Sequence, residues 1–490
     1  MSGLKKQKSL KLNFIMNAIL TISSFIFPLI TFPYVSRVLL PVGTGKVAFA
    51  TSLISYFALF AQLGIPTYGI RACAKVRDDR LELTRTVHEL FIINLIMSVV
   101  AYGVLAVALI AVPRLHEDRL LYVIVSSTML FNCIGMEWMY KALEQYTYIT
   151  VRSIAFKLVA LVAMFLLIHE QSDYIIYGGV SVLAASASNI FNFCHAHRYI
   201  RMRPVGGYRL RRHLRPVAVF FFMSCATTIY THLDTLMLGF MTSDVDVGYY
   251  NAAVKIKSVL LGVVTSLGTV LLPRVSYYVE MKRMEDFWHV TRKAVNFVFL
   301  LAAPLVMYFI LYAKQGINFL SGVNYANSVS PMQVIMPTLL FIGLSNILGI
   351  QILVPLGKEK IVLVSEVAGA LVDLVLNYLL IPRLASTGAA IGTLVAEFVV
   401  LSVQYYALRA DISKVFRAIN YRRILLALLA AGLCSFWVKM IHMDNFLSLV
   451  VSSMLFFGAY LGVMMIMKEE LVLEIFGQVM KVLHIGKTNA

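Results

Sequence analysis

The dominant feature of this 490-residue sequence is a succession of apolar runs, each long enough to cross a lipid bilayer as a helix. A spanning helix needs about 20 predominantly apolar residues, and fourteen runs between charged or turn-rich breaks meet that length. We therefore predict an all-α polytopic membrane protein, because helices satisfy their own backbone hydrogen bonds in hydrocarbon. The predicted spans cover residues 12–36, 43–68, 89–113, 120–140, 153–169, 174–194, 217–241, 247–273, 294–319, 331–356, 361–382, 387–409, 424–442 and 446–467.

The composition excludes the other common classes of protein. Hydrophobic residues make up 60% of the chain and charged residues 14%, against about 45–50% and ~25% in soluble domains. The five cysteines are scattered without the spacing of a disulfide framework, a redox pair or a metal site. The histidines form neither HxxxH nor HExxH. We therefore expect no metal and no other cofactor.

Lysine and arginine fall mostly on one side of the predicted topology. With fourteen spans, the two termini and the loops after even-numbered spans share a side, and that side holds 33 of the 43 basic residues. Seven lie on the other side, and Lys157, Lys255 and Lys257 lie inside spans. Because cytoplasmic loops collect Lys and Arg, both termini are expected in the cytoplasm. The first span has no small-residue cleavage site and is expected to be a retained helix rather than a signal peptide.

The longest polar stretch, residues 195–216, follows the sixth span and contains seven arginines. We interpret residues 198–216 as a basic cytoplasmic linker held against anionic lipid headgroups. The formal net charge of +18 is therefore a consequence of topology. Nucleic-acid binding is not expected, because the chain has no basic soluble module to carry it.

The two halves of the chain each contain a glycine and an arginine at the same separation in the sequence. Gly45 and Arg71 bracket the second span, and Gly248 and Arg274 bracket the eighth span with the same separation. Transporters are often built from two repeated bundles, and a shift of six spans preserves orientation, so this match indicates a parallel repeat. The predicted organisation is an N-terminal six-helix lobe (1–197), the linker (198–216), a C-terminal six-helix lobe (217–410) and two further helices with a tail (411–490).

Six segments between residues 32 and 397 carry a family resemblance. The segments are FPYVSRVLLPVGTGKVAFATSLISYFALFAQLGIPTYGIR (32–71), IYTHLDTLMLGF (229–240), VGYYNAAVKIKS (247–258), LLPRVSYY (271–278), LGIQILVPLGKEK (348–360) and STGAAIGTLVAE (386–397). They are similar to the polysaccharide transporter, or Wzx-type, branch of the multidrug/oligosaccharidyl-lipid/polysaccharide flippase superfamily.

This resemblance implies two six-helix lobes around a central cavity in a bacterial cytoplasmic membrane. It also implies a transporter rather than an enzyme, one that moves undecaprenyl-diphosphate-linked oligosaccharide repeat units from the cytoplasmic to the outer leaflet. The product would be capsule, exopolysaccharide or O-antigen, made together with glycosyltransferases and a polysaccharide polymerase. The alternative is a multidrug or metabolite cation antiporter of the same superfamily, because one architecture hosts several cargoes.

The lysines of the eighth span are candidates to bind a diphosphate. A charged headgroup cannot cross hydrocarbon unaided, so its transporter needs a polar and partly cationic path. Lys255 and Lys257 lie roughly 12 and 15 Å below the outer face at ~1.5 Å per residue, and Asp234 on the seventh span lies at a comparable depth. One interpretation is a structural ion pair that joins the two helices. The other is that Lys255 or Lys257 binds the diphosphate, and Asp234 holds that lysine in place until the substrate arrives. Positions i and i+2 point apart on a helix, so only one lysine is expected to face the site.

Carboxylates gather on the eleventh and twelfth spans. Glu366, Asp373 and Asn377 share one helix face, and Glu397 lies on the next span at a depth similar to that of Asp373. Paired carboxylates at this depth suit a proton or sodium site coupled to transport. The open alternative is that they neutralise the intramembrane lysines.

Two further basic residues, Arg37 and Lys46, flank the outer junction of the first two spans. They either receive the diphosphate or anchor helix ends at the interface. Pro28 and Pro33 are expected to bend the first span, and Pro337 the tenth.

Overall fold

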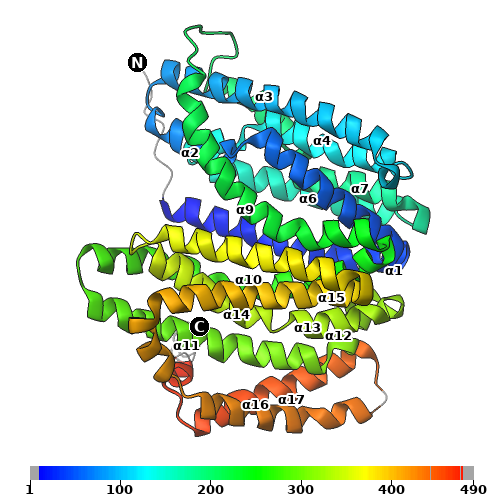
Figure 1. Ribbon diagram of the computed structural model, residues 1–490, viewed down its shortest axis with the longest axis vertical. Coiled ribbons are helices and arrows are strands. Elements are labelled where there is room, and N and C mark those ends of the chain that lie inside the picture. Colours follow the sequence, from blue (N-terminus) through cyan, green and yellow to red (C-terminus); the bar gives the residue numbers. More distant parts are fainter. Residues whose placement is uncertain (1–9, 442, 475, 478–490) are drawn as a thin grey trace, which may run out of the picture. The chain divides into compact units, whose positions relative to one another are not determined.

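The computed structural model describes residues 10–441, 443–474 and 476–477, and over those ranges the chain is helical, with short connections and no strand (Figure 1). This confirms the predicted all-α class. The chain forms two compact units, described one at a time below. Their boundary lies between Asn251 and Ala252, within helix α10 (Asp244–Glu280), whereas the sequence analysis divides the lobes at the linker 198–216.

The first unit contains ten helices or parts of helices within the described residues, and 3₁₀ turns lie in three of their connections. A π-helical segment, Leu183–Ala187, lies between two of them. The helices are α1 (Leu10–Gln62), α2 (Ile65–Lys75), α3 (Arg80–Ala111), α4 (Arg119–Gly135), α5 (Glu137–Ala142), α6 (Tyr146–Leu167), α7 (Tyr174–Val182), α8 (Asn189–His195), α9 (Arg211–Met241) and the start of α10.

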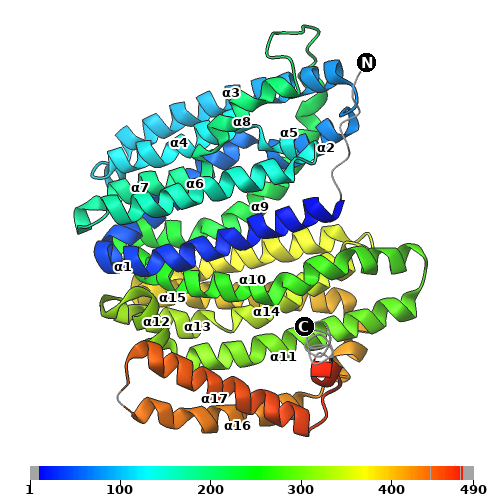
Figure 2. The same cartoon turned by 180° about the vertical axis from the view of Figure 1, so that it is seen from behind.

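Helix α1 is not one straight helix. It has 53 residues, which would extend about 80 Å at 1.5 Å per residue, far beyond the ~30 Å of hydrocarbon. Leu40 has a non-helical backbone (φ 58°, ψ 179°) directly before Pro41, and Figures 1 and 2 show the dark blue start of the helix and its continuation running in different directions. The break is therefore at Leu40, between the predicted spans 12–36 and 43–68, and Pro28 and Pro33 lie within the helical part that precedes it.

The first part of α1 runs parallel to α6. Tyr34 donates to the carbonyl of Ile168 (2.6 Å), Thr150 to the carbonyl of Met16 (2.9 Å) and Lys157 to the hydroxyl of Ser23 (2.9 Å). Each pair is separated by 134 residues, so the register is constant along both helices. Polar side chains therefore fix the position of the N-terminal segment of α1, whose outer face is apolar and exposed.

The second part of α1 lies against α9 in the opposite direction. Tyr56 donates to the carbonyl of Ile229 (3.4 Å), and the ring of Phe49 packs against Gly239. Since Phe49 precedes Tyr56 while Gly239 follows Ile229, the two helices are antiparallel. This pairing connects α9 to the rest of the first unit.

The second unit contains the remainder of α10 and the helices that follow it. A π-helical segment, Ile347–Leu353, interrupts it after α14. The helices are α11 (Met284–Leu311), α12 (Ala313–Ser321), α13 (Val329–Ile335), α14 (Thr338–Asn346), α15 (Glu359–Arg417), α16 (Tyr421–Phe436) and α17 (Asn445–Ile466).

Helix α15 is a tight hairpin. Its 59 residues include Ala385 in a non-helical conformation (φ 46°, ψ −125°). A Cβ added to Gly388 would lie 2.6 Å from the carbonyl oxygen of Leu380, and one on Gly392 would lie 2.9 Å from Oδ1 of Asp373. Residues 19 positions apart in one straight helix would be roughly 28 Å apart, so the chain turns back at Ala385 and its two arms pack on each other.

Eight helices in the described part of the chain are long and apolar enough to span a membrane, or up to ten if each bent pair counts as one span. This is fewer than the fourteen predicted, partly because the interrupted helices α1 and α15 each enter the count as single segments. One bent pair, Val323–Ile335 and Thr338–Leu353, turns by 44° on either side of Pro337, as the sequence predicts. The multi-pass membrane class is confirmed, and the number fourteen stays a prediction.

Large apolar side chains cover the outside of the spanning helices. Ile110 at the end of α3 is 72% exposed and Ile466 at the end of α17 is 80% exposed. In water such surfaces would be strongly unfavourable, at roughly 25 cal/mol per Å², whereas in a bilayer they face lipid. The buried cores of the two units are separate clusters, one around Val87 and Tyr140 and one around Val298 and Tyr308.

Candidate functional site

The two glycines matched by the repeat spacing lie against each other's helices within the first unit. A Cβ on Gly45 would overlap the carbonyl oxygen of Asp244 and lie 2.9 Å from the backbone nitrogen of Gly248. A Cβ on Gly248 would overlap the carbonyl oxygen of Pro41. Small residues allow helix backbones to approach closely in membranes, so this crossing depends on both glycines.

Two ion pairs surround this glycine crossing. Lys46 bonds to Asp118 (2.9 Å), which also accepts a hydrogen bond from Tyr174 (2.7 Å). Arg114 pairs with Asp244 and donates to the carbonyl of Gly239 (3.0 Å). Asp118 is only 2% exposed, so Lys46 in this structure is the partner of a buried carboxylate.

The other residues of these pairs did not emerge from the sequence analysis. Asp118, Arg114 and Asp244 all belong to predicted outer loops or helix ends, where a charge is ordinary and needs no partner. Arg37 lies on the same part of the chain but is exposed, and it donates to the carbonyl of Pro33 four residues earlier. The structure therefore does not place Arg37 and Lys46 in one cluster.

Asp234 on α9 is buried, and it accepts a hydrogen bond from the hydroxyl of Tyr250 at the start of α10. Both residues belong to the first unit. A buried carboxylate requires such a donor, because an unpaired charge in a low-dielectric site is very unfavourable. Tyr250 could not be identified from the sequence, since a tyrosine in an apolar span is usually a packing residue.

Lys255 and Lys257 lie on the part of α10 that belongs to the second unit, and each is half-buried. Among the residues that the structure describes, neither lysine makes an ion pair or a hydrogen bond. Lys157, the third intramembrane lysine, instead donates to the hydroxyls of Ser23 and Ser24 (2.9 and 3.0 Å). No described residue therefore neutralises either lysine of α10 by an ion pair.

The hairpin α15 carries the acidic candidates. Asp373 and Asn377 on its first arm and Glu397 on its second arm are all buried, with Asp373 only 2% exposed. Both Asp373 and Asn377 point at Gly392, where any side chain would overlap Oδ1 of Asn377. Glu366 lies two turns earlier on the first arm and is half-buried, so the hairpin brings Asp373, Asn377 and the second arm together and leaves Glu366 at the edge.

Uncharged polar groups extend the buried seam of this hairpin. Gln404 donates to the hydroxyl of Ser365 (3.0 Å), and both side chains are buried. Gln404 also packs against Gly349 in the π-helical segment. Such segments are frequent at functional sites in helices, and the seam gives the second unit a polar interior between its arms.

The basic linker is docked on α3 rather than lying free. Glu89, which is fully buried, accepts hydrogen bonds from the backbone of Arg209 (2.6 Å) and from the side chains of Arg212 (2.8 Å) and His213 (2.7 Å). The other ring nitrogen of His213, Nδ1, forms a hydrogen bond of 2.8 Å with the hydroxyl of Tyr68. This contact set was not evident from the sequence, where seven arginines and the turn formers Pro204, Gly206 and Gly207 indicate only a basic linker.

We expect Glu89→Ala to destabilise the first unit by about 3 kcal/mol, because removing one partner of a buried charge pair typically costs 3–5 kcal/mol. Arg212 is partly exposed, which places the effect at the lower end. Thermal unfolding of the purified chain in detergent measures it. Glu144→Ala is the matched control, since its pair with Arg77 is exposed and such pairs contribute about 0–1 kcal/mol. Equal melting temperatures for the two variants would contradict the docking role.

Comparison with protein families gives two matches. The model of the family described as "Polysaccharide biosynthesis protein" matches residues 10–279, more than half of the chain. The MatE family model matches residues 220–379. A curated protein of Escherichia coli (strain K12), named "Putative O-antigen transporter", is 24% identical over 403 residues, which cover 82% of this chain and 97% of the relative.

Solved structures share the fold at low sequence identity. The lipid II flippase MurJ, in an inward closed conformation, has a TM-score of 0.71 at 15% identity and covers 94% of this chain and 100% of its own. An inward-facing multidrug resistance MATE family transporter of the MOP superfamily has a TM-score of 0.63 at 14% identity and covers 83% and 99%. These neighbours are transporters built from the same helical fold, and the family match extends over the glycine crossing and both lysines of α10. The chain therefore belongs to the polysaccharide biosynthesis protein family of the multidrug/oligosaccharidyl-lipid/polysaccharide (MOP) flippase superfamily.

Proposed function

We propose that the protein moves undecaprenyl-diphosphate-linked oligosaccharide repeat units from the cytoplasmic to the outer leaflet of a bacterial cytoplasmic membrane. Its termini lie in the cytoplasm in this proposal, and glycosyltransferases and a polysaccharide polymerase act before and after it. The family match and the printed names of an O-antigen transporter and a lipid II flippase support this class of cargo.

The observation that carries the proposal is the pair of lysines on α10. A lysine within a membrane span is costly and rare unless it is paired or functional. Lys255 and Lys257 have neither an ion pair nor a hydrogen bond within the described ranges, and their charge complements a diphosphate. The lipid tail of the cargo stays in the bilayer, so only the charged headgroup and sugars need a polar path.

Coupling to an ion gradient is the second part of the proposal. Asp373 and Glu397, with Asn377, provide buried carboxylate and amide oxygens on one hairpin. Oxygen ligands of this kind bind Na⁺, and buried carboxylates also exchange protons. A cation gradient would then favour return of the empty transporter to its loading state.

Lipid extraction and mass spectrometry test the class of cargo. Cells depleted of the protein are expected to accumulate undecaprenyl-linked repeat units and to lose surface polysaccharide, and a plasmid copy of the gene should reverse both. Intact surface polysaccharide without accumulation would contradict the proposal. Altered sensitivity to small organic cations in those cells would favour the antiporter, the second candidate supported by the MatE match.

Substitution of the lysines tests the diphosphate contact. We expect one of the two variants Lys255→Met and Lys257→Met, that of the lysine facing the site, to reduce export roughly tenfold or more, because a charge-assisted hydrogen bond contributes about 1.5–3 kcal/mol. Export is measured as surface polysaccharide per folded transporter. Lys360→Met is the control, since Lys360 is exposed at the start of α15. If both α10 variants export like the native chain, the lysines do not bind the diphosphate.

A further inference from the structure

A polar pocket opens in the second unit at the ends of three spanning helices. It has a volume of about 260 Å³ and is lined from α11, from the connection between α15 and α16, and from the segment after α17. These elements begin or end candidate spans at Met284, Tyr421 and Ile466. Since charged residues beside span ends lie at the depth of lipid headgroups, the pocket faces that layer.

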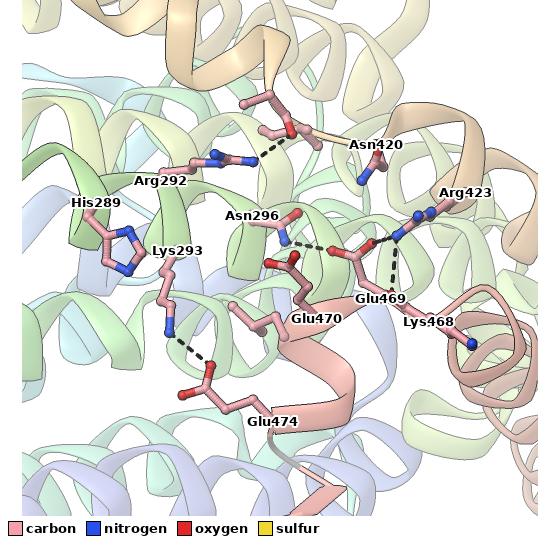
Figure 3. A pocket seen from close by; sticks show the side chains of 13 residues that line it. His289, Arg292, Lys293, Asn296, Asn420, Arg423, Lys468, Glu469, Glu470 and Glu474 are labelled. Atoms are coloured by element: carbon pink, nitrogen blue, oxygen red, sulfur yellow. Dashed lines mark hydrogen bonds and ion pairs between the residues drawn. The ribbon is translucent and has the colours of Figure 1, made fainter.

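Some charges of this pocket are already paired. Lys293 pairs with Glu474 (2.9 Å), and Arg423 pairs with Glu469 (3.1 Å), which also accepts a hydrogen bond from Asn296 (3.0 Å) (Figure 3). Glu469 is buried, whereas Lys293 and Glu474 are about half exposed. These pairs form a fixed wall of the pocket and connect α11 to the last helices.

Other charges lining the pocket have no opposite charge among the described residues. Arg292 donates only to the carbonyl of Ala418, at 3.4 Å, and His289 has no hydrogen bond within the described part of the second unit. Glu470 likewise has neither an ion pair nor a hydrogen bond there, and Figure 3 shows it beside Asn296 and Glu469 without a dashed line. Lys468 also lines the pocket, and Figure 3 shows its amine directed away from the carboxylate of Glu470. The pocket therefore offers the guanidinium of Arg292 and the imidazole of His289 together with the carboxylate of Glu470.

We propose that this pocket binds the headgroup of a zwitterionic phospholipid, with its phosphate on Arg292 and His289 and its primary ammonium on Glu470. Guanidinium groups suit phosphate oxygens, and a histidine ring retains an N–H donor in either protonation state. An anionic headgroup without an ammonium would leave the Glu470 carboxylate facing a phosphate. The volume is below the roughly 300–1,000 Å³ of pockets for drug-sized ligands, which suits a headgroup whose acyl chains stay in the bilayer.

This inference concerns a lipid of the surrounding membrane and does not depend on the cargo. The site lies on the packing contact between α11 and the pair α16 and α17, which follow the two predicted lobes. A bound headgroup would bridge α11 and the segment after α17, in addition to the ion pairs already there. The expected consequence is a protein whose last two helices are held more firmly in membranes that contain phosphatidylethanolamine.

Native mass spectrometry of the purified full-length chain tests the site. The probes are phosphatidylethanolamine and phosphatidylglycerol with identical acyl chains. We expect the native chain to bind phosphatidylethanolamine about tenfold more tightly, and Arg292→Ala to lower that affinity roughly tenfold, as expected for one charge-assisted hydrogen bond. Glu470→Gln should bring the two lipids within about twofold of each other, because it removes the carboxylate that selects the ammonium.

Two control variants and a competition complete the design. Arg422→Ala and Glu285→Gln remove exposed charges that do not line the pocket, and both should bind lipid like the native chain. Glycerophosphoethanolamine should displace the lipid at lower concentration than inorganic phosphate does. Equal binding of both lipids by the native chain, or equal displacement by inorganic phosphate, would overturn the proposal. If Arg292→Ala does not fold, His289→Ala takes its place and should lower the affinity for phosphatidylethanolamine. Glu470→Gln should still bring the affinities for the two lipids within about twofold of each other, and failure of both results would overturn the proposal.

Discussion

Replacing Gly45 with alanine is expected to lower export by roughly tenfold or more, the largest effect of any single methyl group in the first unit. The added carbon would overlap the carbonyl oxygen of Asp244 and press on the backbone of Gly248. Backbone atoms cannot move aside as a flexible side chain can, so the helices must separate. Overpacking of this kind typically costs about 1–3 kcal/mol or more. Export per folded transporter and the melting temperature in detergent measure the two consequences.

Substitutions of two other glycines test whether the effect comes from the close crossing of the helices. Gly248→Ala should have a similar effect, because its methyl group would overlap the carbonyl oxygen of Pro41. Gly103→Ala is the control, since nothing lies within 4 Å of its added carbon, and alanine favours a helix by about 1 kcal/mol over glycine. The close crossing is contradicted if Gly45→Ala and Gly103→Ala export and unfold alike.

Removing the carboxylates of the α15 hairpin should uncouple transport from its ion gradient. We expect the double variant Asp373→Asn, Glu397→Gln to lose the dependence of export on the gradient of Na⁺ or of protons, with export falling about tenfold or more. The physical reason is that amides neither exchange protons in this range nor balance the charge of a bound cation. Transport into vesicles, with Na⁺ replaced by choline or with the pH gradient collapsed, measures the dependence and identifies the ion.

Two other glutamates on α15, one exposed and one half-buried, provide comparison variants for the double variant. Glu359→Gln alters an exposed residue in the first turn of α15 and should leave coupling unchanged. Glu366→Gln should have a smaller effect than the double variant, because Glu366 is half-buried and Asp373 is only 2% exposed. Gradient-dependent export by the double variant at the native rate would contradict the coupling proposal.

Hydropathy predicted the class of the fold and also the two points where the long helices turn, because Leu40 lies between the predicted spans 12–36 and 43–68 and Ala385 lies between 361–382 and 387–409. Leu40 and Ala385 interrupt α1 and α15 with positive φ angles, and neither residue type favours that conformation. At Leu40 the interruption is adjacent to Pro41, whereas Pro28 and Pro33 remain inside the helix. A proline in a membrane helix is tolerated when neighbouring groups satisfy the freed carbonyl, and the sequence does not show which neighbours are present.

The candidate site was predictable in its residue types and only partly in its geometry. Helical periodicity placed Asp373 and Asn377 on one face, and the structure adds Gly392 as the residue they approach. The match between Gly45 and Gly248 came from spacing alone, and their mutual contact required the fold.

Partners that lie far apart in the sequence could not be predicted. Lys46 with Asp118 and Glu89 with His213 are separated by 72 and 124 residues. A charged residue near the end of a span has no periodic signal that identifies its partner, because either water or a headgroup could satisfy it equally well. The docking of the linker on α3 is therefore a finding of the structure.

Reconstitution of the purified protein tests the central claim most directly. The probe is the undecaprenyl-linked oligosaccharide isolated from depleted cells, incorporated into both leaflets of vesicles and oxidised from outside by periodate, which does not cross the membrane. With the transporter and an ion gradient, we predict that nearly all of the oligosaccharide becomes accessible, whereas about half does so in protein-free vesicles. The Lys255→Met, Lys257→Met double variant should behave like protein-free vesicles. Accessibility that stays at about half with the native protein, under gradients of both Na⁺ and protons, would contradict the account.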